Sequence, residues 1–131
     1  MVSFSLKVRF YETDLMGVVH HANYLRWFEM GRVEYFNEMM GEGFMVPIVD
    51  VNCRYRQSAR FDDEVIIETV LEKLSKVKLS FSYRALRAKD GVLLAEGKTT
   101  NGITTAEGKV ARLSDSYMER LNKMLEEERE T

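Results

Sequence analysis

One unusually apolar helical segment constrains the fold of this chain more than any other feature. From about Asn23 to Met40, apolar residues recur every three to five positions, which is the spacing of an α-helix. The central stripe comprises Leu25, Phe28, Val33, Phe36 and Met40. The residues that widen it are Tyr24, Trp27, Tyr35 and Met39. Because a helix that is apolar over most of its girth must be covered on several sides, this segment predicts a helix enclosed by other elements. Gly41 and Gly43 supply a C-cap for it.

The sequence on both sides of this helix alternates in the way that strands do. Val2 to Tyr11 places Phe4, Leu6, Val8 and Phe10 on one face, and residues 12–22 then break the period. After Pro47, five strand-like stretches follow, at residues 49–55, 64–74, 77–87, 92–105 and 109–113. The first of these five puts Val49, Val51, Cys53 and Tyr55 on its apolar face. Gly97 and Gly102 are candidate bulges in the fourth.

The chain ends in a second expected helix, from about Asp115 to Glu128. Ser116 and Glu119 have capping-box spacing there, and the apolar side is formed by Tyr117, Leu121, Met124 and Leu125. Helices and strands are therefore segregated along the sequence, which predicts an α+β protein with an antiparallel sheet curled around the first helix. The chain has 131 residues, and residues 1–131 are expected to form a single domain. Since open sheet edges invite pairing, a dimer with a continuous sheet is expected.

Composition limits the cellular compartments and the classes of binding partner to be expected for this chain. The formal net charge of −2 provides no overall field that would attract nucleic acid or an anionic membrane. Cys53 is the only cysteine, so no intramolecular disulfide forms, as is usual in a reducing compartment. No stretch approaches the ~18–20 apolar residues that cross a bilayer, and Met1 to Phe10 lacks the apolar core of a signal peptide. These observations predict a cytoplasmic protein without membrane insertion.

The segment from Glu12 to Tyr24 carries an unusual concentration of reactive groups. Two carboxylates, one glycine, two histidines and one asparagine fall within it. Gly17 permits a backbone with positive φ, and the first N–H groups of the following helix have no partner within that helix. Such N–H groups bind a carbonyl oxygen that gains negative charge, while an upstream carboxylate acts on the carbonyl carbon or on water. The pattern thus allows a hydrolytic site, although a purely structural turn or cap has the same residues.

The residues of this segment also resemble a known family. Arg9-Phe10-Tyr11-Glu12-Thr13-Asp14, Gly17-Val18-Val19-His20-His21-Ala22-Asn23-Tyr24 and Phe28-Glu29 are similar to the signature of the 4-hydroxybenzoyl-CoA thioesterase family. Within that family, the chain most resembles the branch associated with the bacterial Tol–Pal system. Ala59-Arg60-Phe61-Asp62-Asp63-Glu64 also resembles this branch, at the turn between its second and third strands.

This resemblance implies a hotdog fold, active sites at a dimer interface and hydrolysis of an acyl-CoA thioester. It places the catalytic aspartate at Asp14, as nucleophile or as general base on water. It assigns polarisation of the thioester carbonyl to the backbone N–H of His21, whose imidazole is a second catalytic candidate. The substrate contacts it implies around them are Gly17, Val18, Val19, Asn23 and Tyr24. The branch usually has tyrosine where this chain has His20, which leaves that neighbour's role open.

Other residues in and near the segment have competing interpretations. Glu12 is expected to be a structural acid, and Asn23 is a helix cap or a group that orients Asp14. Cys53 offers a rival thiolate chemistry, but it lies on the apolar register of a strand and is expected to behave as a small hydrophobe. No metal-binding spacing occurs, and no cofactor is expected apart from the CoA that belongs to the substrate.

CoA carries phosphates, so its site should include basic residues. Lys73, Lys76 and Lys78 cluster at an expected turn between two strands, and Lys76 is the chosen candidate. The expected partners are thus an acyl-CoA substrate and further copies of the chain, at least a homodimer and by expectation a tetramer. Two other functions stay open: a non-hydrolytic binding protein, and a hotdog dehydratase that would use Glu29 or Glu34 as its acid.

Overall fold

The computed structural model describes residues 1–39 and 45–130, with side chains described for residues 1–33 and 45–129. The expected C-cap at Gly41 and Gly43, and the side chains of Glu34, Tyr35, Phe36, Met39 and Met40, lie outside these ranges. The elements are β1 (Val2–Lys7), a 3-10 turn (Phe10–Glu12), α1 (Ala22–Met39), β2 (Ile48–Tyr55), β3 (Glu64–Leu74), β4 (Lys78–Arg87), β5 (Leu93–Gly102) and α2 (Asp115–Glu130).

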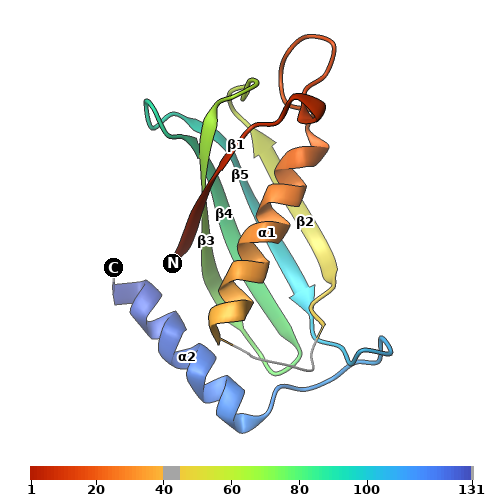
Figure 1. Ribbon diagram of the computed structural model, residues 1–131. Helices are drawn as coiled ribbons and strands as arrows, with labels where there is room; N and C mark the ends of the chain where they lie inside the picture. The colour runs from red at the N-terminus through yellow and green to blue at the C-terminus, as the bar shows by residue number, and fades with distance from the viewer. Residues whose placement is uncertain (40–44, 131) are drawn as a thin grey trace.

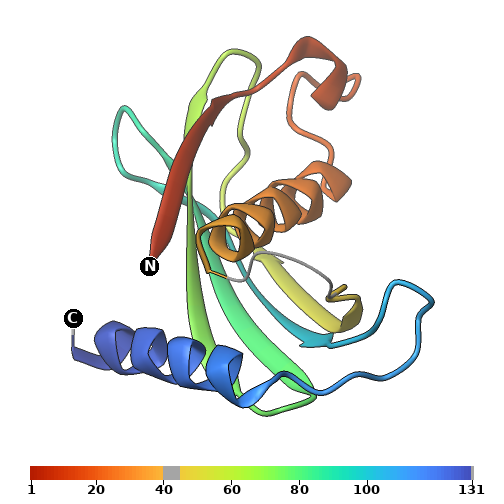
Figure 2. The ribbon, with the colours of Figure 1, turned by 60° about the horizontal axis from the view of Figure 1, so that its bottom comes forward.

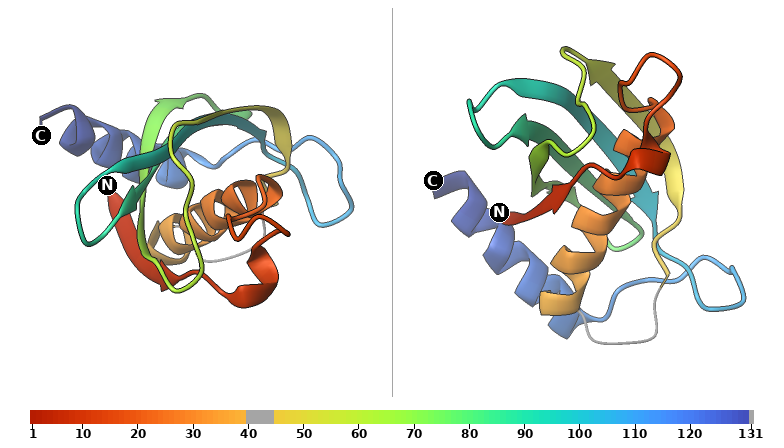
Figure 3. Two further views of the ribbon diagram at one scale, coloured as in Figure 1. Left: turned by 90° about the horizontal axis from the view of Figure 1, so that it is seen from above. Right: turned by 45° about the horizontal axis from the view of Figure 1, so that its top comes forward.

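The five strands form one antiparallel sheet in the order β1-β3-β4-β5-β2. Seen from above, this sheet curves around α1, whose 18 residues run along the concave side (Figures 1 and 3). The α+β architecture expected from the segregated helices and strands is therefore confirmed. Because β2 is an edge strand, one row of its backbone groups faces away from the sheet.

The side of α1 that faces the sheet is densely packed. Tyr24, Trp27 and Phe28 are each at most 2% exposed, and Phe28 stacks on Tyr83 of β4 with ring centroids 4.8 Å apart. Leu25 and Val33, by contrast, are exposed, Val33 by 51%. The prediction that this stripe is covered was thus wrong at two positions within the chain, because the sheet encloses only one side of the helix.

Two glycines allow α1 to approach the sheet closely. A Cβ at Gly97 would lie 2.9 Å from Cε2 of Phe28, and a Cβ at Gly31 would overlap Oγ1 of Thr69. The prediction of bulges at Gly97 and Gly102 was wrong, since both keep regular pairing and the register shifts lie elsewhere in the sheet. At Gly97, the missing side chain makes room for an aromatic ring instead.

Four strand predictions need correction. β1 stops at Lys7, because the chain turns into the 3-10 segment, and Phe10 is consequently 76% exposed instead of facing the core. β5 ends at Gly102, and residues 109–113 form only an isolated bridge, between Thr104 and Val110. The apolar face expected for β2 is largely exposed as well, with only Cys53 half-buried.

The C-terminal helix α2 packs against β3 at the lower end of the molecule (Figure 2). Leu121 and Leu125 are buried, as its apolar side predicts. Its cap is Ser114 and not Ser116, because Oγ of Ser114 accepts the N–H of Tyr117. In the described ranges, no helix is long and apolar enough to cross a membrane.

Candidate active site

A short hairpin carries Asp14 between β1 and α1. An isolated bridge pairs Thr13 with Val19, and the Asp14 N–H donates to the Val18 carbonyl at 2.9 Å. Gly17 closes the turn with φ +77, in the left-handed region that the sequence predicts for a glycine here. The Gly17 N–H returns to the Asp14 carbonyl at 3.1 Å. The turn is therefore specified by its own backbone.

The two carboxylate oxygens of Asp14 have different surroundings. Oδ1 accepts the N–H of Met16 at 2.8 Å and, at 3.4 Å, that of Val18, as in an Asx turn. Within the described ranges, no hydrogen bond or ion pair engages Oδ2. Arg9 is not an ion-pair partner of Asp14, since its guanidinium donates to the Tyr11 hydroxyl. One oxygen thus fixes the turn and the other remains available to a substrate.

The start of α1 lies directly after the hairpin. Nδ1 of His20 accepts the N–H of Ala22 at 3.2 Å, and the His20 carbonyl accepts the N–H of Asn23. His20 therefore caps the helix, so the histidine at this position has a structural role. No described residue accepts the His21 N–H, which leaves this donor free at the helix N-terminus.

The His21 side chain is exposed but held by an aromatic neighbour. Its ring stacks on Tyr55 of β2, with centroids 4.1 Å apart and planes at 14°. The Tyr55 hydroxyl donates to the His21 carbonyl at 3.3 Å, and burial raises the pKa of Tyr55 to about 12, so it stays a donor at neutral pH. The sequence offered no signal for this contact, because 34 residues separate the two positions.

Glu12 is the buried anchor beneath the hairpin, as the structural reading of this acid predicts. It is 3% exposed, and its carboxylate accepts the indole N–H of Trp27 at 2.9 Å and the Arg9 N–H at 2.8 Å. The Glu12 carbonyl accepts the N–H of His20 and the side-chain amide of Asn23. The prediction that Asn23 caps the helix or orients Asp14 was wrong, because its amide ties α1 to Glu12.

Of the remaining residues expected to contact the substrate, two lie at the surface and two lie in the core. Gly17 and Val18 lie on the partly exposed part of the hairpin. Val19 and Tyr24 are buried, at 3% and 2% exposed, and the Tyr24 hydroxyl already accepts the Ala59 N–H. Both side chains lie in the core and support the wall behind the hairpin.

Lys76 lies far from Asp14 within one chain. It occupies the turn between β3 and β4, where Nζ forms an exposed ion pair with Asp115 at 3.3 Å. The hairpin adjoins the opposite end of β3, since Val18 bridges Arg60 just before that strand. Eleven strand residues at roughly 3.3 Å each therefore separate the two ends.

Cys53 does not have the environment of a reactive thiol. It packs partly buried against the core, and burial raises the pKa of its thiol, which disfavours the thiolate at neutral pH. Nor does the described part of the chain gather three histidine, cysteine or acidic residues in a position to hold a metal ion.

Comparison with known proteins identifies the family. Residues 8–121 match the family model described as the Thioesterase-like superfamily. The chain belongs to this superfamily. Acyl-CoA thioesterase YbgC of Haemophilus influenzae is 30% identical over 95 residues, which cover 65% of this chain and 68% of that protein.

Solved structures extend the similarity over nearly the whole fold of this thioesterase-like chain. The hypothetical protein TT1821 from Thermus thermophilus is 35% identical with a TM-score of 0.83, covering 93% of this chain and 98% of its own. The DHNA-CoA thioesterase from Staphylococcus aureus is 28% identical with a TM-score of 0.81, covering 95% and 88%. The hotdog fold and the thioesterase class implied by the resemblance are thereby confirmed.

Proposed function

We propose that the protein hydrolyses acyl-CoA thioesters to a free acid and CoA, with Asp14 as the reactive carboxylate. The observation that carries the proposal is one hairpin with two groups left free for a substrate. Oδ2 of Asp14 and the N–H of His21 have no hydrogen-bond partner among the described residues, while the N–H groups of the hairpin are bonded at Met16, Gly17, Val18, Val19 and His20. YbgC of Haemophilus influenzae is named an acyl-CoA thioesterase, which supports the same substrate class.

In this reaction the thioester oxygen accepts the His21 N–H, and the helix N-terminus stabilises the negative charge that develops on it. Asp14 then acts in one of two ways. As nucleophile it attacks the carbonyl carbon, releases CoA as thiolate and leaves a mixed anhydride that water hydrolyses. As general base it removes a proton from the water that attacks. The exposed His21 imidazole is available to protonate the leaving thiolate.

We further place the protein in the Tol–Pal-associated branch of the 4-hydroxybenzoyl-CoA thioesterase family, as a cytoplasmic enzyme. The residue pattern at 59–64 and the similarity to YbgC support this placement. No metal or redox cofactor enters the proposed reaction, because a carboxylate and a backbone donor suffice for thioester hydrolysis.

A homodimer, and by extension a tetramer, belongs to the same proposal. The edge strand β2 exposes Ile48, Val49 and Val51, each by at least 43%. An antiparallel pairing of two β2 strands would cover these residues and bring the β3–β4 turn of one copy to the end of the sheet where the other copy has its hairpin. This arrangement supports a contact between Lys76 and the CoA phosphates of a neighbouring site.

The test is release of free CoA from a panel of short, long and aromatic acyl-CoAs, followed with a thiol reagent. We expect turnover on at least one substrate. Acyl-CoA binding without turnover would favour the non-hydrolytic alternative. Dehydration of a 3-hydroxyacyl thioester without CoA release would favour the dehydratase, although Glu29 lies roughly 12 Å along α1 from His21 and would have to act on another copy.

A further inference from the structure

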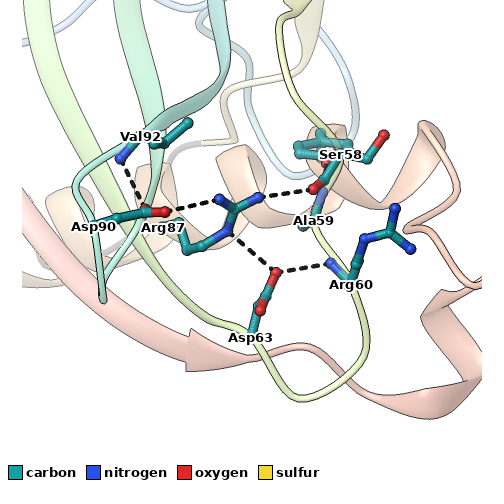
Figure 4. A network of polar contacts seen from close by, with 8 residues as sticks. Ser58, Ala59, Arg60, Asp63, Arg87, Asp90 and Val92 are labelled. Carbon is teal, nitrogen blue, oxygen red and sulfur yellow. Dashed lines mark hydrogen bonds and ion pairs between the residues drawn. The ribbon is translucent and has the colours of Figure 1, made fainter.

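A polar network behind the hairpin is centred on Arg87, at the end of β4 (Figure 4). Its side chain is only 18% exposed and makes three separate contacts. Nη2 donates to the Ser58 carbonyl at 3.1 Å, Nη1 to Asp90 at 3.0 Å, and Nε lies 3.5 Å from the Asp63 carboxylate. One guanidinium thus joins the β4–β5 turn to the loop between β2 and β3.

This loop is held at both of its ends. Arg87 binds Ser58 at its start and Asp63 at its end, and the Asp63 carboxylate also accepts the Arg60 N–H at 2.9 Å (Figure 4). Between them, Asp62 adopts φ +68, a left-handed conformation that a non-glycine residue rarely takes. Such a conformation persists only where neighbouring contacts fix it.

The clamped loop is in turn the support of the Asp14 hairpin. The Val19 N–H donates to the Ala59 carbonyl at 2.8 Å, and Val18 bridges Arg60. On the other flank, the Val8 N–H donates to the Asp63 carbonyl at 2.9 Å. The chain before the hairpin and the second arm of the hairpin are therefore both tied to a loop whose position depends on Arg87.

We infer that Arg87, through Asp63, is a positioning residue for catalysis, which sets where the Asp14 carboxylate lies relative to the His21 N–H. Arginine suits this task because its planar fork presents donors in fixed, spread directions toward a carbonyl and two carboxylates, whereas the donors of lysine all lie on one compact ammonium. Displacement of a reacting group by about 1 Å can cost up to about a hundredfold in rate. The inference rests on the proposed function, but it also predicts a change in the structure that needs no substrate.

The two acidic partners of Arg87 provide a matched comparison. Asp63→Asn weakens the contact that holds the hairpin support, whereas Asp90→Asn weakens only the contact to the β4–β5 turn. We expect Asp63→Asn and Arg87→Lys each to lower kcat about tenfold or more with KM changed less than about threefold, and Asp90→Asn to leave kcat within about twofold. The double variant Arg87→Lys/Asp63→Asn should be little worse than either single one, because both break the same contact.

Hydrogen exchange of the Val19 amide, measured in folded protein, supplies the second readout. We expect faster exchange in Asp63→Asn and Arg87→Lys than in Asp90→Asn and wild type. Unchanged exchange and kcat in the first two variants, or an equal loss of kcat in Asp90→Asn, would overturn the inference. Failure of the wild type to hydrolyse any acyl-CoA would instead refute the proposed function, and the exchange comparison would still test the positioning role.

Discussion

The close approach of α1 to the sheet at Gly97 yields a quantitative prediction for Gly97→Ala. The added Cβ would lie 2.9 Å from the backbone oxygen of Asn52 and 2.9 Å from Cε2 of Phe28. The backbone oxygen belongs to the neighbouring strand β2, which must shift slightly, and the ring of Phe28 must move as well. That movement disturbs its stack on Tyr83 and pushes α1 away from β5.

Overpacking of this kind costs about 1–3 kcal/mol. Replacing glycine by alanine also lowers the conformational entropy of the unfolded chain, which stabilises the folded state by about 0.4–1 kcal/mol. With the middle of each range, the net loss is about 1.3 kcal/mol, which for a domain of this size lowers Tm by roughly 4–5 °C. Thermal unfolding followed by circular dichroism measures the shift.

Gly102→Ala on the same strand is the matched control. Its Cβ would meet only a side-chain atom, Cγ2 of Val49, at 3.4 Å, and we expect its stability within about 0.5 kcal/mol of wild type. A Gly97→Ala protein as stable as Gly102→Ala would refute the claim that the helix rests directly on this glycine.

Three further predictions concern the site. Gly17→Ala should lower the free energy of unfolding by about 1 kcal/mol in urea, because alanine is strained at φ +77, whereas Gly17→Asn should lose less; equal loss in both would contradict this interpretation of the turn. Burial raises the pKa of Tyr55 from 10 to about 12, so its contribution to stability is complete below pH 10 and is lost as the pH rises toward 12. Urea unfolding of Tyr55→Phe should accordingly show a smaller loss of stability over this interval than wild type, and an identical loss would exclude the shift. Cys53→Ala should keep kcat/KM within about threefold in the CoA-release assay. Burial raises the pKa of this thiol, which makes it a poor nucleophile at neutral pH. A hundredfold loss of kcat/KM would instead favour a thiolate mechanism.

The elements that sequence reasoning located well are those whose signal is local. α1, α2, β3 and β4 repeat their apolar residues with a clear period, and each lies within two residues of its expected bounds. The left-handed turn at Gly17 is also a local property, because only a residue without Cβ takes this conformation at little cost.

Features that depend on contacts distant in sequence were missed. His20 and not Asn23 caps α1, because the side-chain amide of Asn23 donates to the Glu12 carbonyl instead. Similarly, local patterns do not show that Lys76 lies at the opposite end of the sheet from the hairpin of its own chain, because this depends on how β3 runs relative to the hairpin. Arg87 carries no motif, and only the fold brings it to the Asp63 loop.

The reactive role of Asp14 is tested most directly by kcat/KM of Asp14→Asn on the best acyl-CoA. Asparagine retains Oδ1, which accepts the N–H groups of Met16 and Val18, so the hairpin and Tm should be preserved while the negative charge is lost. We predict a fall of at least about a hundredfold in kcat/KM at unchanged Tm. Equal kcat/KM in the variant and wild type would contradict it.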